Sequence, residues 1–145
     1  MRSFLFSLGL FLAVLIFSCS QKQDYKQIRT EVVAVHDKVM KDADLAYAQR
    51  KVVDSIYRQP KSAGGVSLSR ADSLNMLLLI AEIDKANHQM EEWMDSFEPD
   101  VSGKSDAASI AYFHSELKKI RNLDQHFRKV MVRSDHFLDS LKQGK

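Results

Sequence analysis

Cysteine, glycine and proline are all scarce in this sequence of 145 residues. The single cysteine, Cys19, cannot form a disulfide within the chain. The five glycines and two prolines fall mostly in two short stretches, 59–65 and 98–103. Because Gly and Pro weaken or break helices, their scarcity elsewhere predicts long uninterrupted helices.

Blocks of like charge are also absent. The 21 basic and 19 acidic residues alternate along the chain and give a formal net charge of +2. A nucleic-acid-binding protein normally carries a basic stripe, so we expect no nucleic-acid partner. The 45% of hydrophobic and 28% of charged residues are ordinary for a soluble globular protein, and the length predicts one domain.

The first twenty residues have the pattern of a secretory signal peptide. Met1-Arg2-Ser3 supplies a positive charge, and residues 4–17 are almost entirely apolar. An ordinary transmembrane helix needs about 20 apolar residues, and this run is shorter. Small residues follow at Ser18-Cys19-Ser20, where a signal peptidase needs room at the bond it cleaves.

Ile16-Phe17-Ser18-Cys19 resembles the lipobox of bacterial lipoprotein precursors, although Phe17 is bulkier than the residue usual there. The resemblance implies that diacylglycerol and further acyl chains such as palmitate are attached to Cys19. It also implies that residues 1–18 are removed and that no free thiol remains to act as a nucleophile. Several acyl chains anchor a protein stably in a membrane. The alternative is a plain secretory signal, or an uncleaved anchor, with an incidental cysteine.

Residues 19–24 are then the lipidated cysteine and a short polar tether. The residue after the cysteine, Ser20, is not an aspartate. By resemblance to the sorting rules of bacterial lipoproteins, this favours the outer membrane. The tether does not decide between the periplasmic and the surface face.

Apolar residues recur at three- and four-residue steps in three segments, which predicts helices over about 25–58, 69–98 and 105–141. No window has the two-residue alternation of a strand. Because both connections are short, successive helices should be antiparallel neighbours. The expected fold class is therefore all-α: an up-down-up antiparallel three-helix bundle with coiled-coil-like packing over residues 25–145.

Polar residues mark the expected helix starts. Ser69 and Asp72 have the spacing of a capping box, and Ser105 or Asp106 is expected to cap the third helix. Residues 76–81 (MLLLIA) are apolar all round and should be the most deeply buried part of the second helix. Its expected core stripe is Met76, Ile80, Ile83, Met90, Met94 and Phe97. Apolar residues off the main stripes leave a dimer open: Met40, Tyr47, Leu77, Leu78 and Val130.

Histidines and methionines form one candidate site. Reflecting the helices about the centres of the two loops places three histidines at similar levels, with three methionines nearby. Such a cluster suits copper or haem iron. Each histidine lies one position off its apolar stripe, however, and no pair has the spacing of a helical metal motif. We therefore expect no metal or cofactor, with metal or haem binding as the alternative. The candidate ligands are His36, His88, His114, Met40, Met90 and Met94.

Two acids and the only tryptophan are the other candidates for chemistry or binding. Asp42 and Asp124 interrupt the apolar stripes, but the same reflection puts them well over a turn apart, so we expect them not to pair. Trp93 is expected to pack at the bundle end near Gly103, with the anchoring of a partner as the alternative. Nucleophile and phosphate-binding motifs are missing, so we expect no enzyme activity and no catalytic residue.

Two helical segments carry a family resemblance. Residues 35–40 (VHDKVM) and 86–97 (ANHQMEEWMDSF) resemble small helical bacterial lipoproteins of unassigned function, often labelled viral A-type inclusion proteins. Residues 41–44 (KDAD) depart from that pattern. The resemblance covers most of the chain after the signal peptide and provides no catalytic residue.

The sequence therefore predicts a lipid-anchored protein of the bacterial cell envelope. Its non-enzymatic helical domain is expected to bind an unidentified envelope protein or to support envelope organisation. The binding surface should be a contiguous exposed patch of the apolar residues that lie off the main stripes. The sequence names neither the partner nor a ligand, and it leaves a homo-oligomer open.

Overall fold

The computed structural model describes residues 24–59 and 68–143, and within these ranges it contains three helices and no strand. They are α1 (Tyr25–Arg58), α2 (Arg70–Ser96) and α3 (Asp106–Gln143). The predicted helices start and end within two residues of these bounds. The predicted signal peptide, Cys19 and most of the tether lie outside the described residues.

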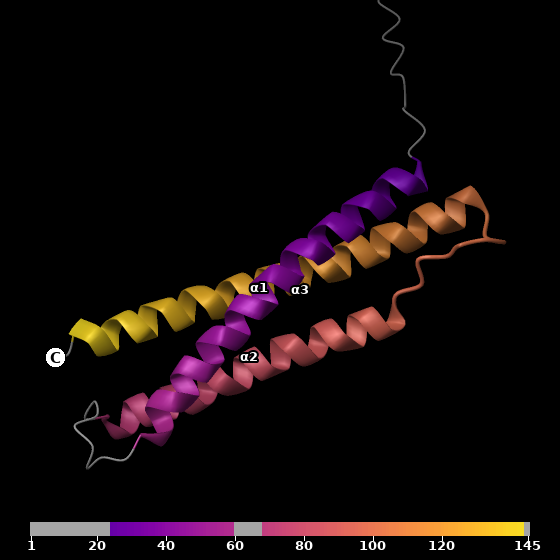
Figure 1. Ribbon diagram of the computed structural model, residues 1–145. Helices are drawn as coiled ribbons and strands as arrows, with labels where there is room; N and C mark the ends of the chain where they lie inside the picture. The colour runs from indigo at the N-terminus through magenta and orange to yellow at the C-terminus, as the bar shows by residue number, and fades with distance from the viewer. Residues whose placement is uncertain (1–23, 60–67, 144–145) are drawn as a thin grey trace, which may run out of the picture.

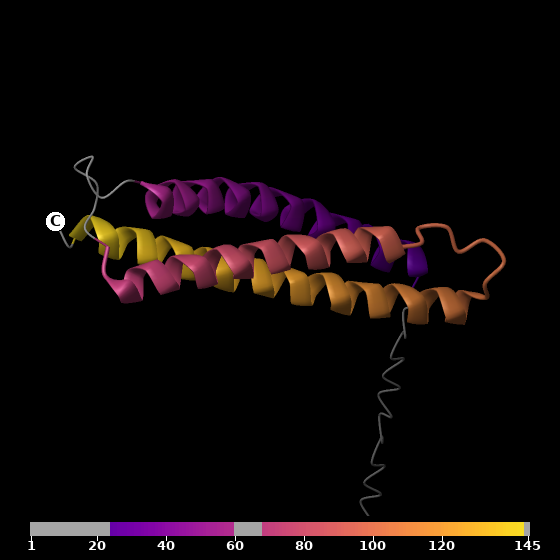
Figure 2. The same cartoon turned by 90° about the horizontal axis from the view of Figure 1, so that it is seen from below.

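The helices form the expected up-down-up bundle, in which α1 and α3 run in the same direction and α2 runs against both (Figures 1 and 2). With 34, 27 and 38 residues, the helices are about 50, 40 and 57 Å long at 1.5 Å per residue. The first turn of α1 lies at the same end of the bundle as the connection between α2 and α3. Helices α1 and α3 pack together most extensively, whereas α2 makes less contact with each of them.

Side-chain caps hold the start of each helix. The Asp24 carboxylate accepts a hydrogen bond from the backbone N–H of Lys26 at the start of α1. At the start of α2, both halves of the predicted capping box between Ser69 and Asp72 are present. The Ser105 hydroxyl accepts from the backbone N–H of Ala108, so Ser105 caps α3. Such caps satisfy N–H groups that have no partner inside the helix.

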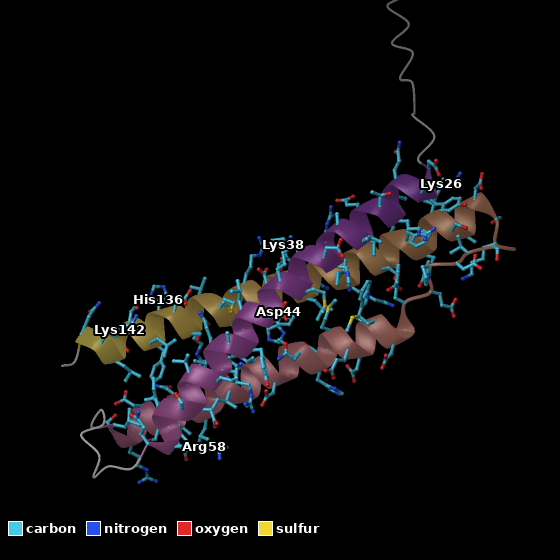
Figure 3. All side chains as sticks on the ribbon, in the orientation of Figure 1. Lys26, Lys38, Asp44, Arg58, His136 and Lys142 are labelled. Carbon is cyan, nitrogen blue, oxygen red and sulfur yellow. The ribbon has the colours of Figure 1, made fainter. Side chains whose placement is uncertain are left out.

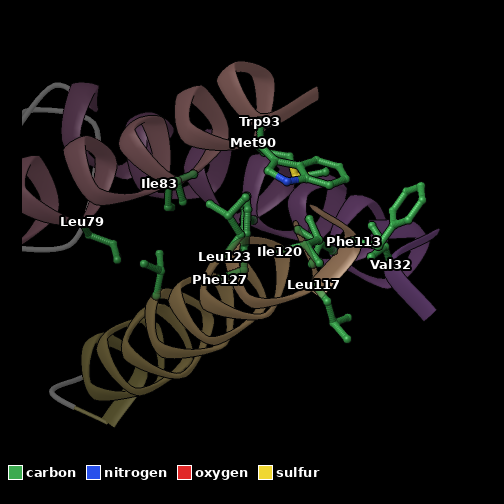
Figure 4. Packing of buried hydrophobic residues seen from close by; sticks show 14 of the residues in the cluster. Val32, Leu79, Ile83, Met90, Trp93, Phe113, Leu117, Ile120, Leu123 and Phe127 are labelled. Atoms are coloured by element: carbon green, nitrogen blue, oxygen red, sulfur yellow. The ribbon is translucent and has the colours of Figure 1, made fainter. Parts of the chain in front are cut away.

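The core is a continuous apolar seam between the three helices (Figure 4). Its buried residues repeat at steps of three and four, as coiled-coil packing requires. On α1 they are Ile28, Val32, Val39, Ala46 and Val53; on α2 they are Met76, Leu79, Ile83, Ala86, Met90 and Trp93; on α3 they include Phe113, Leu117, Ile120, Leu123, Phe127 and Val130.

Helix α2 is rotated relative to the prediction. Leu79 is buried in place of Ile80, and Met94 is 38% exposed. Leu77 and Leu78 are each 46% exposed, so the prediction that the MLLLIA segment is the most deeply buried part was wrong. A helix in a three-helix bundle buries only a stripe, and an all-apolar segment gives no signal for the rotation that places it. Val130, predicted to lie off the stripe of α3, is instead 3% exposed and belongs to the core.

Candidate interaction groove between α1 and α2

A groove of about 570 Å³ runs between α1 and α2, and none of its lining residues comes from α3. Its apolar part combines methionines with a tyrosine and an alanine, and its polar part contains three carboxylates, one guanidinium, an amide and an imidazole. The lining residues are Met40, Ala43, Asp44, Tyr47, Arg50, Asp84, Asn87, His88, Met90, Glu91 and Met94.

The apolar floor of the groove is partly open to water. Met90 is buried and Met40 is half-buried, whereas Tyr47 is 53% and Met94 is 38% exposed. Unbranched methionine side chains adapt their shape to what they contact, and they are frequent on surfaces that accept apolar partners. The floor is therefore suited to receive another apolar surface.

One ion pair closes part of the groove, and two carboxylates flank the rest. Arg50 donates from Nε and Nη2 to the two carboxylate oxygens of Asp84, at 2.5 and 3.0 Å, and so ties α1 to α2. This hydrogen bonding raises the pKa of Arg50. No hydrogen bond or ion pair within the described residues engages Asp44, which lies midway along α1 (Figure 3). On α2, the Glu91 carboxylate is 3.8 Å from Nδ1 of the exposed His88.

The predicted metal ligands are only partly brought together. Met40, Met90, Met94 and His88 line the groove. His36 does not line it; its ring lies 5.8 Å from that of Trp93 and is hydrogen-bonded to Asp37. His114 lies exposed on α3. Among the residues that the structure describes, no group of three or more His, Cys, Asp or Glu side chains is arranged to hold a metal.

The true register explains why the three histidines do not converge. Cross-helix partners on α1 and α3 differ by 86 in residue number for Gln49 and Asp135 and by 90 for Glu31 and Arg121. His36 is therefore level with about residue 122, which is roughly two turns from His114. Two reflections move a residue by twice the separation of their centres. Reflection about the loops placed His36 near residue 112 because this separation is larger than the loop composition suggested.

The same register brings the two interrupting acids together, contrary to prediction. The ammonium of Lys38 donates to Asp42 at 2.7 Å and to Asp124 at 2.5 Å. Asp124, which is 8% exposed, also forms an ion pair with Arg128 at 2.6 Å. The hydrogen bonds to Asp124 and then to Asp42 raise the pKa of Lys38. These acids therefore link α1 to α3 through shared cations and have a structural role.

Trp93 lies in the core and is 6% exposed, so its side chain is not available as a surface anchor. Its Nε1–H donates to Oε2 of Glu116 at 2.9 Å, and its ring stacks on Phe97 with 4.8 Å between the ring centroids. Glu116, 2% exposed, also accepts from Lys119 at 2.7 Å. Sequence reasoning did not find this buried carboxylate, although a buried indole N–H usually needs an acceptor.

No described helix is both long enough and apolar enough to cross a membrane.

Comparison with known proteins does not assign a function to the groove. No family model, curated protein or solved structure matches the chain. The resemblance of residues 35–40 and 86–97 to small helical lipoproteins therefore stays a prediction.

Proposed function

We propose that the chain is a lipid-anchored protein of the bacterial envelope whose non-enzymatic helical bundle binds a protein partner through the α1–α2 groove. The observation that carries this proposal is the methionine-lined floor, where Tyr47 and Met94 remain substantially exposed to water. Apolar side chains gathered in one hollow and rimmed by charges are typical of a binding surface.

The anchor in this proposal is Cys19, and the chain between it and the bundle is short. Six residue steps separate Cys19 from Tyr25, which at about 3.5 Å per residue span at most about 20 Å. The end of the bundle at which α1 begins would then lie close to the membrane surface. The groove begins at Met40, about 23 Å further along α1. A partner would thus meet the bundle in the space beside the membrane, on the outer-membrane side that Ser20 favours.

The environment of the buried acids supports a non-enzymatic domain. Asp124 is held by two cations, and Glu116 by the indole of Trp93 and one cation. General acid–base catalysis needs carboxyl groups that face a cleft and exchange protons there. Neither Asp124 nor Glu116 lines the α1–α2 groove.

Binding of a soft metal ion is the second candidate function. Its support is the presence of Met40, Met90, Met94 and His88 in one groove, because thioether and imidazole ligands suit Cu(I). It uses one of the three histidines first considered and leaves His36 and His114 out.

Two measurements test the proposed function. Mass spectrometry of the protein purified from its native membranes should find the acyl chains on an N-terminal Cys19, and Cys19→Ala should abolish both the acylation and the removal of residues 1–18. A photo-crosslinking amino acid at Tyr47, in the groove, should capture an envelope protein. The same group at Lys118, exposed on α3, should not. An unmodified thiol, or equal crosslinking at both positions, would refute the proposal.

A further inference from the structure

We propose that the partner segment that fills the α1–α2 groove is an amphipathic helix with an apolar face flanked by basic residues. This inference rests on the proposed function and specifies the chemistry of its partner. Helix-in-groove binding uses apolar side chains at steps of three and four on one face of the bound helix.

The groove lies where a fourth helix could pack against α1 and α2. It lies between two antiparallel helices, and all its lining residues come from these two. A helix laid in it would contact α1 and α2 as helices contact their neighbours in a four-helix bundle. From Met40 to Arg50 the groove follows α1 for about 15 Å, or nearly three turns. Met40, Tyr47, Met90 and Met94 would provide the apolar surface.

The charges of the groove select a cationic occupant. Asp44, Asp84 and Glu91 line the groove together with a single guanidinium, that of Arg50, and this guanidinium is bound to Asp84. Asp44 and Glu91 therefore contribute negative charge to a protein whose formal net charge is positive.

These two carboxylates also lie on opposite edges. In the register set by Arg50 and Asp84, Asp44 on α1 is level with about residue 90 on α2, next to Glu91. A Lys or Arg on either flank of a bound helix would then meet a carboxylate. Beside the floor lies Lys51, whose ammonium is 4.8 Å from the centroid of the Tyr47 ring. It can swing away because its side chain is long and exposed.

Exposed apolar residues continue the same two helix faces toward the Arg58 end of α1. Tyr57 follows Arg50 by seven residues, and Leu77 precedes Asp84 by seven, so each repeats a groove position two turns away. They are 38% and 46% exposed. An occupant of four to five turns would cover them as well.

Binding of synthetic peptides to the purified lipidated protein in detergent micelles tests the inference. The probe is a fluorescein-labelled 18-residue helix with Leu at steps of three and four and Lys on both flanks; the matched peptide has Glu on both flanks. Fluorescence anisotropy at 50 and 300 mM salt should show that the Lys peptide binds about tenfold more tightly than the Glu peptide, and more weakly at high salt.

Charge reversal in the groove should exchange the preference. The Asp44→Lys/Glu91→Lys variant should bind the Glu peptide about tenfold more tightly than the Lys peptide. The control Glu98→Lys/Asp139→Lys changes the net charge equally at exposed sites outside the groove and should behave as the parent protein. Met94→Glu should weaken both peptides, and circular dichroism should show unchanged helix content.

Several results would overturn the inference. Equal binding of the two peptides, or no binding of either, would refute a cationic helix as the occupant. Sedimentation of the parent as a dimer that Met94→Glu dissociates would assign the groove to a second copy of the chain. Tight Cu(I) binding that Met40→Leu/Met94→Leu abolishes, without peptide binding, would assign it to metal. None of these outcomes changes the result of mass spectrometry at Cys19. That measurement therefore tests the lipid anchor independently of the occupant of the groove.

Discussion

The hydrogen bond between Trp93 and Glu116 should account for a measurable part of the stability of the bundle. Replacing Glu116 by Leu leaves the indole N–H of Trp93 buried without its acceptor. Replacing Trp93 by Phe leaves the Glu116 carboxylate, 2% exposed, with Lys119 as its remaining partner. Because each single replacement strands one buried polar group, the double replacement should cost less than the two single ones together.

The expected size follows from burial and partners. Leaving a buried donor or acceptor unsatisfied costs about 1–3 kcal/mol, and hydrogen bonds to charged groups contribute about 1.5–3 kcal/mol. Lys119 adds little because its side chain is 54% exposed, where ion pairs are weak. We therefore expect an interaction free energy of about 2 kcal/mol between the two sites. The free energy of unfolding typically changes by about 2 kcal/mol per molar urea. The midpoint of the double variant should therefore lie about 1 M urea above the value expected from adding the effects of the two single replacements.

The assay is urea unfolding of the parent, both single variants and the double variant, followed by circular dichroism at 222 nm because Trp93→Phe removes the only tryptophan. The control cycle pairs Trp93→Phe with Glu92→Leu, whose side chain is 64% exposed in the parent and should behave independently of the tryptophan. If the Trp93 and Glu116 replacements add within about 0.5 kcal/mol, the hydrogen bond does not contribute as argued.

Three further predictions test the core and its polar links. The hydrogen bond to Asp124 raises the pKa of Lys38. The stabilisation from charged Lys38 is therefore complete below the ordinary pKa of 10.5 and is lost as the pH rises beyond it. Between about pH 8 and 11.5, the thermal unfolding temperature should fall more steeply for the parent than for Lys38→Met. The hydroxyl of Ser134 is buried without a hydrogen-bond partner within the described residues, so Ser134→Ala should raise the free energy of unfolding by about 1 kcal/mol in urea, and a loss of that size would show that the hydroxyl is satisfied. Leu79→Asp should unfold the bundle because Leu79 is buried, whereas Leu78→Asp should change the free energy of unfolding by less than about 1 kcal/mol because Leu78 is exposed. Similar circular dichroism spectra for the two variants would mean that α2 does not bury Leu79 in preference to Leu78.

Local features of the fold were predictable from the sequence. The ends of a helix are indicated by the loss of apolar periodicity and by capping residues, and both signals come from residues within a few positions of the helix end. The bounds of all three helices were therefore predicted to within two residues, and the capping box of Ser69 and Asp72 was confirmed. The up-down-up order followed from the short connections.

Features that depend on how two helices are placed relative to each other were not predictable. The register between α1 and α3 depends on how far apart the two chain reversals are centred, and an error of a few residues in that separation moved Asp124 away from Asp42 in the prediction. The rotation of α2 was hidden by the all-apolar segment at 76–81. The groove combines residues at the edges of two stripes, so Asp44 and Glu91 gave no signal along the sequence alone.

The C-terminal end of α3 lies at the opposite end of the bundle from the first turn of α1 (Figures 1 and 2). In the proposed lipid-anchored protein, a fluorescent protein or an epitope fused after Lys145 would therefore follow the end of a helix about 57 Å long whose other end lies beside the first turn of α1. If the anchor is as proposed, antibody or protease accessibility of such a fusion in intact cells would report on which side of the membrane the bundle lies.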